Sequence, residues 1–339
     1  MIDRRVGADP PLQDQYGELL RNSSDEICMK KRDQRTGIIG ECELPLIDLG
    51  GLMSCDERKK RECVAAIAKA SSEWGFFQVV NHGISQQLLE EMRREQMKVF
   101  QMPFEKKASC GLLNDSYRWG NPKATSSKQF SWSEAFHVPL TKISERACYG
   151  EFTSLREVME QFAASMSKLA RLLAGVLAEN LGQPRTAFDE ICNDDTCFLR
   201  LNRYPKCEIT PDMIGLIPHT DSDFLTILYQ DQVGGLQLMK DSKWVAVKPH
   251  REALIVNIGD LFQAWSNNEY KSVEHKVMAN GKMERYSIAY FLCPSYDSLI
   301  GSCKEPSLYK KFTFGEFRKQ VQEDVKKTGQ KIGLPRFLL

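Results

Sequence analysis

The chain has 339 residues, and its 46 lysines and arginines nearly balance its 45 aspartates and glutamates, giving a formal net charge of +1. A nearly neutral chain has no field that would attract nucleic acid or an anionic membrane, so the expected partner is a small molecule or another protein. The sequence does not identify a protein partner. No stretch has the apolar length of a secretion signal or a membrane span, since "LARLLAGVLAENL" is interrupted by Arg171 and Glu179. Eleven cysteines without a C-x-x-C pair favour reduced thiols in a cytoplasmic protein.

Residues 1–40 are polar and weakly patterned, which predicts a loosely ordered arm with room for one short helix. Residues 41–150 predict an α/β region, with a strand at "LPLIDL", a helix at "ERKKRECVAAIAKASSEW" and a strand at "GFFQVVNHG". Ser85 is expected to cap a second helix that stops near Pro103. The remainder of this region is rich in aromatic residues and loops. It predicts the lip of a pocket, although a plain packed loop explains the same residues.

Residues 151–196 predict a long helical spine that ends near Gly182. Residues 197–310 predict a β-rich core, because short β-type runs alternate with turn residues in the manner of a sandwich or barrel. Residues 311–339 predict a C-terminal helix and an apolar tail. The predicted fold is mainly β with flanking helices. The apolar stripe of the spine consists of Leu155, Met159, Phe162, Met166, Leu169, Leu173 and Val176.

A candidate metal site lies in the β-rich half of the chain. His219 and Asp221 are two residues apart, so in a strand they share one face, and His275 lies between two valines on the inward face of a later strand. Two imidazoles and one carboxylate form the facial arrangement of non-haem Fe(II) oxygenases. A bare H-x-D pair also fits a solvated turn before a strand, and the ligand set alone also permits zinc with a catalytic water.

A candidate anion site lies ten residues after His275. Arg285 and Ser287 share a face of the apolar strand "RYSIAYF", where a buried guanidinium is costly unless an anion pairs with it. No acid in that strand can do so, which favours an anionic ligand. A salt bridge to a distant acid remains the alternative.

The turn between these two strands determines whether the two candidate sites face each other. A two-residue Asn-Gly turn would pair His275 with Tyr286 and direct Arg285 to the opposite face. A three-residue loop at residues 279–281, with its glycine in the left-handed conformation, pairs His275 with Arg285. We predict the three-residue loop and a shared pocket.

Several motifs at matching spacing resemble the plant 2-oxoglutarate and Fe(II)-dependent dioxygenases, among them "WGFFQVVNHG", "HTDSDFLTIL", "VNIGD", "VEHKV" and "RYSIAYF". The resemblance implies a double-stranded β-helix (jelly roll) core that uses Fe(II), 2-oxoglutarate and O2, supported by ascorbate. This sequence departs from the family pattern at Arg203 and Lys206, which weakens the assignment of Asn202. The resemblance implies that the metal is held by His219, Asp221 and His275, and that 2-oxoglutarate is bound by Arg285, Ser287, Tyr204 and Asn202.

The block "SYRWGNPKATSSKQFSWSEAFHVPL" further resembles the gibberellin 2-oxidases, especially the class acting on C20 gibberellins. This resemblance implies 2β-hydroxylation of a gibberellin, which inactivates the hormone. The alternatives are a dioxygenase of the same fold that acts on a flavonoid or at another gibberellin position, and a noncatalytic β-barrel that binds a small anion. The candidate substrate-binding residues are Tyr117, Arg118, Trp119, Trp132, Phe136 and Phe291.

Overall fold

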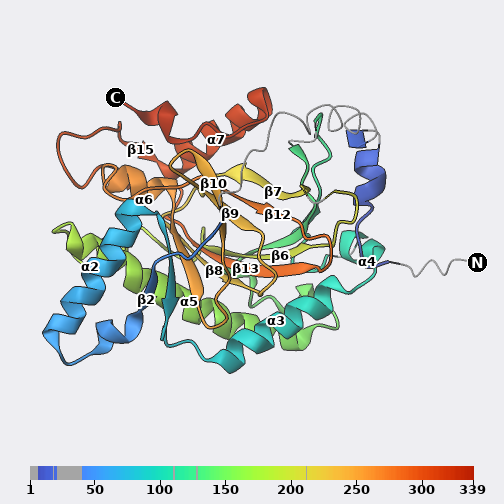
Figure 1. The fold of residues 1–339 in the computed structure, drawn as a ribbon, viewed down its shortest axis with the longest axis horizontal. Coiled ribbons are helices and arrows are strands. Elements are labelled where there is room, and N and C mark those ends of the chain that lie inside the picture. The colour runs from blue at the N-terminus through green and yellow to red at the C-terminus, as the bar shows by residue number, and fades with distance from the viewer. Residues whose placement is uncertain (1–6, 18, 21–39, 110, 127–128, 211) are drawn as a thin grey trace, which may run out of the picture.

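The computed structural model describes residues 7–17, 19–20, 40–109, 111–126, 129–210 and 212–339. Two β-sheets form its centre, with helices around them (Figure 1). The larger sheet has the strand order β2 (Leu46–Asp48), β3 (Phe76–Val80), β11 (Leu254–Ile258), β8 (Leu225–Gln230), β13 (Arg285–Leu292), β6 (Phe198–Tyr204), β5 (Glu134–Pro139) and β4 (Tyr117–Trp119).

The smaller sheet has five strands and packs on the larger one through its own apolar cluster. Phe76, Tyr204 and Ile255 of the larger sheet belong to the same buried cluster as Leu238 and Val277 of the smaller sheet. This two-sheet core confirms the predicted jelly roll. The order of the smaller sheet is β1 (Glu41–Cys42), β10 (Lys243–Val247), β9 (Leu236–Lys240), β12 (His275–Met278) and β7 (Ile214–His219), and a separate ribbon pairs β14 (Leu299–Ile300) with β15 (Phe312–Thr313).

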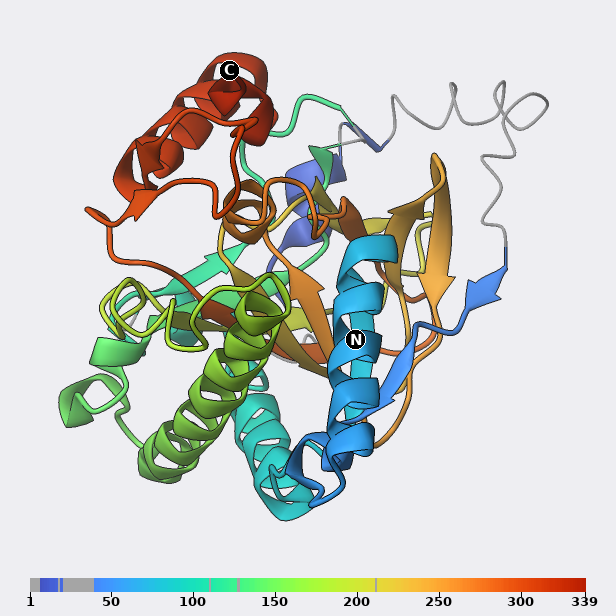
Figure 2. The ribbon, with the colours of Figure 1, turned by 90° about the vertical axis from the view of Figure 1, so that its left-hand side faces the viewer.

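Three helices pack side by side against the larger sheet, namely α2 (Glu57–Glu73), α3 (Gln86–Phe100) and α5 (Thr153–Asn180) (Figure 2). The predicted spine is α5, and all seven residues of its apolar stripe are buried. Ser85 caps α3 as predicted, because its side chain accepts a hydrogen bond from the Leu88 amide. Three shorter or peripheral α-helices are α4 (Phe104–Ser109), α6 (Asp260–Trp265) and α7 (Phe314–Thr328).

Part of the predicted loose arm is packed in place. Residues 12–17 and 19–20 are helical, and Leu12 and Tyr16 are buried against Phe130 and Trp132 of the lip. The other positions of the arm, residues 1–6, 18 and 21–39, lie outside the described residues. The lip itself contains β4 and β5, two strands where the sequence pattern predicts loops.

The predicted hairpin between the two candidate sites is wrong. Strand β12 lies between β7 and β9 in the smaller sheet, whereas β13 lies between β6 and β8 in the larger sheet, so His275 does not pair with Arg285. The connecting segment crosses from one sheet to the other, where the Asn280 carbonyl accepts from the Cys207 amide. The φ angle of Gly281 is not positive, so the left-handed conformation predicted for this glycine is also wrong. The two side chains nevertheless face one cavity, because the two sheets lie against each other.

A buried ionic cluster ties the lip to the core. The Glu134 carboxylate accepts from Lys107 Nζ at 2.6 Å and from Arg203 Nη1 at 2.7 Å, and it also accepts the Tyr117 hydroxyl. The side chains of Lys107 and Glu134 are fully buried. Arg203 additionally donates to Asp9 of the arm at 2.6 Å. The arginine that departs from the family pattern is therefore held by acids on three other segments, Glu134, Asp9 and Glu284.

We expect Glu134→Gln to lower the free energy of unfolding by about 3–5 kcal/mol, because it leaves the buried cations Lys107 and Arg203 without their shared anion. Urea unfolding followed by circular dichroism measures this change. Glu284→Gln is the matched control, since Glu284 pairs with the same arginine at 2.7 Å but is partly exposed. The control should cost less than about 1 kcal/mol. Equal losses in the two variants would contradict the assigned role of Glu134.

Candidate active site

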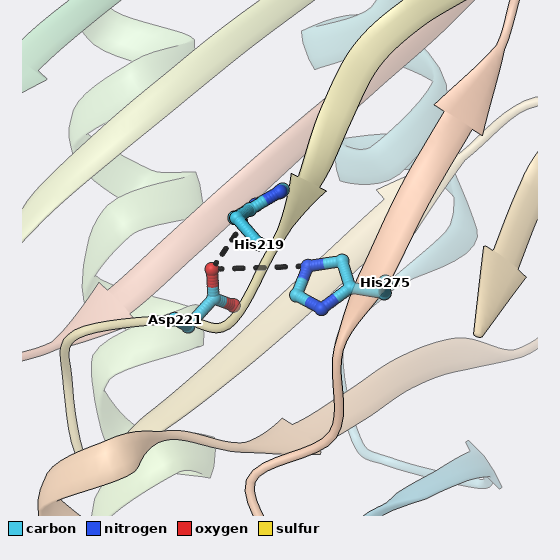
Figure 3. Close-up of side chains that lie close together, drawn as sticks. All are labelled: His219, Asp221 and His275. Atoms are coloured by element: carbon cyan, nitrogen blue, oxygen red, sulfur yellow. Dashed lines mark ion pairs between the residues drawn. The ribbon is translucent and has the colours of Figure 1, made fainter. Parts of the chain in front are cut away.

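Three potential metal ligands converge where β7 and β12 meet (Figure 3). His219 is the last residue of β7 and His275 the first of β12, and these two residues are partners in the antiparallel register. Their Nε2 atoms lie 3.6 and 3.8 Å from Oδ1 of Asp221. Asp221 lies beyond the end of β7, so the turn rather than a shared strand face brings it to His219. The ligand atoms of all three residues lie within 4.8 Å of one another.

Hydrogen bonds fix the orientation of these side chains. Nδ1 of His219 lies 2.8 Å from the Ile217 carbonyl, and Nδ1 of His275 lies 3.1 Å from the Val273 carbonyl. A carbonyl can only accept, so each Nδ1 carries the hydrogen and each Nε2 presents a lone pair towards Asp221. On the opposite side, Oδ2 of Asp221 accepts from Thr226 at 2.6 Å and from Asn257 at 2.8 Å. Oδ1 of Asp221 thus remains free for a metal.

The protonation states at this cluster suit a cation. Burial and the neighbouring His275 lower the pKa of His219 to about 3. Burial alone would raise the pKa of Asp221, but the two histidines and the hydrogen bonds from Thr226 and Asn257 outweigh it and lower that pKa to about 2. At neutral pH the cluster therefore contains an uncharged His219 imidazole and an ionised carboxylate, the forms that bind metal ions.

Arg285 forms a receptor for an anion on the facing sheet. Its side chain is 1% exposed, and its Nη atoms donate to Gln230 Oε1 at 2.6 Å and to Ser287 Oγ at 3.3 Å. Its Nε has no hydrogen-bond partner, and no acid pairs with it among the described residues. The guanidinium lies 5.0 Å from the centre of the Tyr204 ring. A buried guanidinium with neutral neighbours fits a ligand carboxylate, which would supply the missing charge.

The other predicted co-substrate residues adjoin Arg285 through the register of β13 and β6. Arg285 pairs with Tyr204, and Ser287 pairs with Asn202. The Asn202 amide nitrogen lies 3.5 Å from Ser287 Oγ, and its carbonyl oxygen accepts from Arg200. These four predicted residues therefore form one continuous polar patch on the inner face of the larger sheet.

One cavity of about 250 Å³ joins the metal cluster to this patch. The smaller sheet supplies the two histidines, and the larger sheet supplies the arginine and its neighbours. The predicted shared pocket therefore exists although the hairpin prediction is wrong. All seven predicted metal and co-substrate residues line this cavity: His219, Asp221, His275, Arg285, Ser287, Tyr204 and Asn202.

Of the six candidate substrate residues, Phe291 lines this cavity. Tyr117 and Phe136 are buried in the core on the other face of the larger sheet, Trp119 packs edge-on against Phe104, and Trp132 belongs to the cluster around Tyr16. Arg118 is exposed on β4 and donates to backbone carbonyls. None of these five lies among the residues that line the cavity, as far as the described chain shows.

Sequence reasoning missed several cavity residues that alternation could have found. In β6, Phe198 and Arg200 share the face of Asn202 and Tyr204, so period-two spacing points to both. In β5, His137 faces the cavity while its neighbour Phe136 faces the core. Because the pattern of residues 134–139 predicts a loop rather than a strand, it offers no basis for choosing between those two faces.

Two imidazoles and one carboxylate opposite an unpaired arginine define a non-haem Fe(II) oxygenase that takes an anionic co-substrate. Family models agree with this class: the 2OG-Fe(II) oxygenase superfamily matches residues 195–294, and the non-haem dioxygenase in morphine synthesis N-terminal region matches residues 44–151. The chain belongs to the 2OG-Fe(II) oxygenase superfamily. Fe(II) and 2-oxoglutarate are the metal and co-substrate of this family.

Curated relatives resemble almost the whole chain. Gibberellin 2-beta-dioxygenase 6 of Oryza sativa subsp. japonica is 58% identical, over 98% of this chain and 96% of the relative. Gibberellin 2-beta-dioxygenase 8 of Arabidopsis thaliana is 56% identical, over 97% and 98%. Among solved structures, JOX2 in complex with 2OG, Fe and JA is 33% identical, with a TM-score of 0.71 over 85% of this chain and 87% of that chain.

Two further structural facts concern the thiols of the protein and its helices as possible membrane spans. All nine cysteines within the described residues are free. No helix in the described part of the chain combines the length and the apolarity that a membrane crossing needs.

Proposed function

We propose that this protein hydroxylates a gibberellin at C-2, in the 2β orientation, and thereby inactivates the hormone. The observation that carries the proposal is the His219, Asp221 and His275 cluster facing Arg285 across one cavity. The names of the 58% and 56% identical relatives support the substrate class. A preference for C20 gibberellins, a supporting role for ascorbate and a cytoplasmic location are part of the proposal, and the free cysteines agree with a reducing compartment.

We assign Fe(II) to His219, Asp221 and His275, and the distal carboxylate of 2-oxoglutarate to Arg285 and Ser287. The donor set fits the metal, because it combines imidazole nitrogen and carboxylate oxygen without a thiolate. The receptor fits the co-substrate, because Arg285 is buried, has no acid partner among the described residues and keeps an unpartnered Nε. Tyr204 and Asn202 complete this receptor from β6.

The bound iron would supply the redox chemistry, in which O2 and 2-oxoglutarate give succinate, CO2 and one oxygen atom inserted into a substrate C–H bond. The chain itself supplies orientation. Carbonyl groups of Ile217 and Val273 hold the two imidazoles, and Thr226 and Asn257 hold Asp221. Arg285 fixes the far end of the co-substrate. No residue of the cavity is needed as a general base, because hydrogen abstraction is part of the redox chemistry.

The proposal is tested by incubating the purified protein with Fe(II), 2-oxoglutarate and ascorbate. A C19 and a C20 gibberellin are added in competition, and the products are identified by mass spectrometry. The expected result is 2β-hydroxylation, with the C20 compound consumed first. A parallel panel of flavonoids is the control for substrate class. Turnover of flavonoids without turnover of gibberellins would reject the assignment.

A further inference from the structure

A second cavity adjoins the active site and extends it under α7. This cavity has a volume of about 220 Å³, and it shares the walls formed by His137, Phe198, Ser222 and Phe291 with the first. Each cavity alone is smaller than the roughly 300–1,000 Å³ usual for ligand sites, whereas the two joined through their common wall reach that range. The cavity beside the metal cluster and the cavity beside α7 therefore meet at one common wall.

The common wall is apolar and aromatic. Phe198 stacks on Phe291 with ring centres 4.3 Å apart, and His137 stacks on the other side of Phe198 at 4.0 Å. Burial, followed by the positive charges of Arg200 and Arg318, lowers the pKa of His137 to about 4, so this ring is uncharged at neutral pH. An apolar aromatic wall of this kind suits a rigid hydrocarbon skeleton.

Arg200 lies on the wall of the first cavity and lacks an acid partner among the described residues. Its Nε donates to Asn202 Oδ1 at 2.8 Å, which holds the side chain in place, while its two Nη atoms have no hydrogen-bond partner in the described chain. Arg200 pairs with Ala289 of β13, a small residue that leaves space beside the guanidinium. It is four residues from Tyr204, or roughly 14 Å along the strand, and it touches the co-substrate receptor only through the hydrogen bond to Asn202, as far as the described residues show.

Arg318 lies on the wall of the second cavity and also has no ion-pair partner among the described residues. It extends from α7, where Nη1 donates to the Tyr296 hydroxyl at 2.9 Å and the guanidinium lies 5.6 and 5.8 Å from the ring centres of Tyr296 and Phe314. The aromatic rings hold the cation in place without neutralising it. Asp223 also borders this cavity, but no ion pair joins it to Arg318.

We propose that Arg200 and Arg318 are the specificity-determining residues for the substrate, each binding one carboxylate of a rigid apolar dicarboxylate that lies on the Phe198 and Phe291 rings. This inference rests on the proposed gibberellin hydroxylation and deepens it. A C20 gibberellin retains two free carboxylates, whereas a C19 gibberellin has closed one of them into a lactone. Two separate cations, one on the wall of each cavity, therefore favour the C20 class.

Anaerobic equilibrium binding to the complex of the protein with Fe(II) and 2-oxoglutarate tests this inference without turnover. Calorimetry compares a C20 dicarboxylate with a C19 lactone in the unchanged protein, in Arg200→Gln and in Arg318→Gln. Each variant should bind the dicarboxylate roughly 10- to 100-fold more weakly, the value of a charge-assisted hydrogen bond. One of the two glutamine variants should bind the C19 lactone as tightly as the unchanged protein does. The carboxylate that the replaced arginine would bind is closed into the lactone ring in this ligand. Arg58→Gln, on the exposed face of α2, is the charge control.

The affinity for 2-oxoglutarate should stay within about twofold in Arg318→Gln, which also shows that this variant folds. Arg200→Gln also loses the hydrogen bond to Asn202 of the co-substrate receptor, so its loss of dicarboxylate affinity should clearly exceed any loss of 2-oxoglutarate affinity. Arg200→Lys and Arg318→Lys, which keep the charge, should recover part of the lost affinity. Unchanged dicarboxylate affinity in both glutamine variants, or a loss confined to 2-oxoglutarate, would overturn the inference while leaving the proposed function intact. Failure of the unchanged protein to bind any gibberellin would overturn both.

Discussion

Asp221→Ala is expected to abolish turnover by removing the metal. The two imidazoles that remain cannot complete the facial set, and the site also loses the charge that balances the cation. Loss of residues that merely orient metal ligands typically costs 10- to 100-fold in metal affinity, so loss of a ligand should exceed about 100-fold. Iron content after equilibrium dialysis, measured by mass spectrometry, and succinate release report the two effects separately.

Asp189→Ala is the matched control for this variant, because Asp189 is an exposed acid outside the cavity. It should retain iron and activity. Circular dichroism should show that Asp221→Ala remains folded. Iron bound at the level of the unchanged protein in Asp221→Ala would show that the cluster is not the metal site.

Arg285→Gln is expected to raise the KM for 2-oxoglutarate by about 30-fold or more. Breaking a buried, hydrogen-bonded charge pair costs roughly 2–5 kcal/mol, and each 1.36 kcal/mol corresponds to a factor of ten. Glutamine retains hydrogen-bonding capacity near Gln230 and Ser287 but not the charge or the forked pair of donors. Initial-rate kinetics at varied 2-oxoglutarate measure the change.

Arg285→Lys separates charge from geometry. Lysine keeps the positive charge but cannot form two parallel hydrogen bonds, so the KM should lie between those of the unchanged protein and the glutamine variant. Iron affinity should be unchanged in both variants, because Arg285 is not among the metal-cluster residues. An unaltered KM in Arg285→Gln would contradict the assigned role of this residue.

Local patterns were enough to predict the buried stripe of α5 and five residues of the cavity, namely His219, Asp221, His275, Arg285 and Ser287. Alternation placed Arg285 with Ser287, and the α5 stripe was buried as expected. What failed was the pairing of β12 with β13. Successive strands usually pair, but here the chain crosses from the smaller sheet to the larger one. The sequence of residues 279–284 does not indicate that β12 pairs with β7 or that β13 pairs with β6.

The other residues that line the two cavities were harder to predict because their positions depend on tertiary context. His137 and Phe136 are neighbours whose roles are set by which face of β5 meets the cavity, and that face is fixed by pairing with β6. Arg318 reaches the cavity from α7, more than a hundred residues from Arg200. No periodicity within one segment connects these positions.

The most direct test of the central claim is the product formed from a C20 gibberellin by the purified protein in the presence of Fe(II), 2-oxoglutarate and labelled dioxygen. The predicted result is a 2β-hydroxylated gibberellin whose new oxygen atom derives from dioxygen, with one succinate formed for each product molecule. A product formed without 2-oxoglutarate, or an unchanged gibberellin in the presence of every component, would contradict the claim.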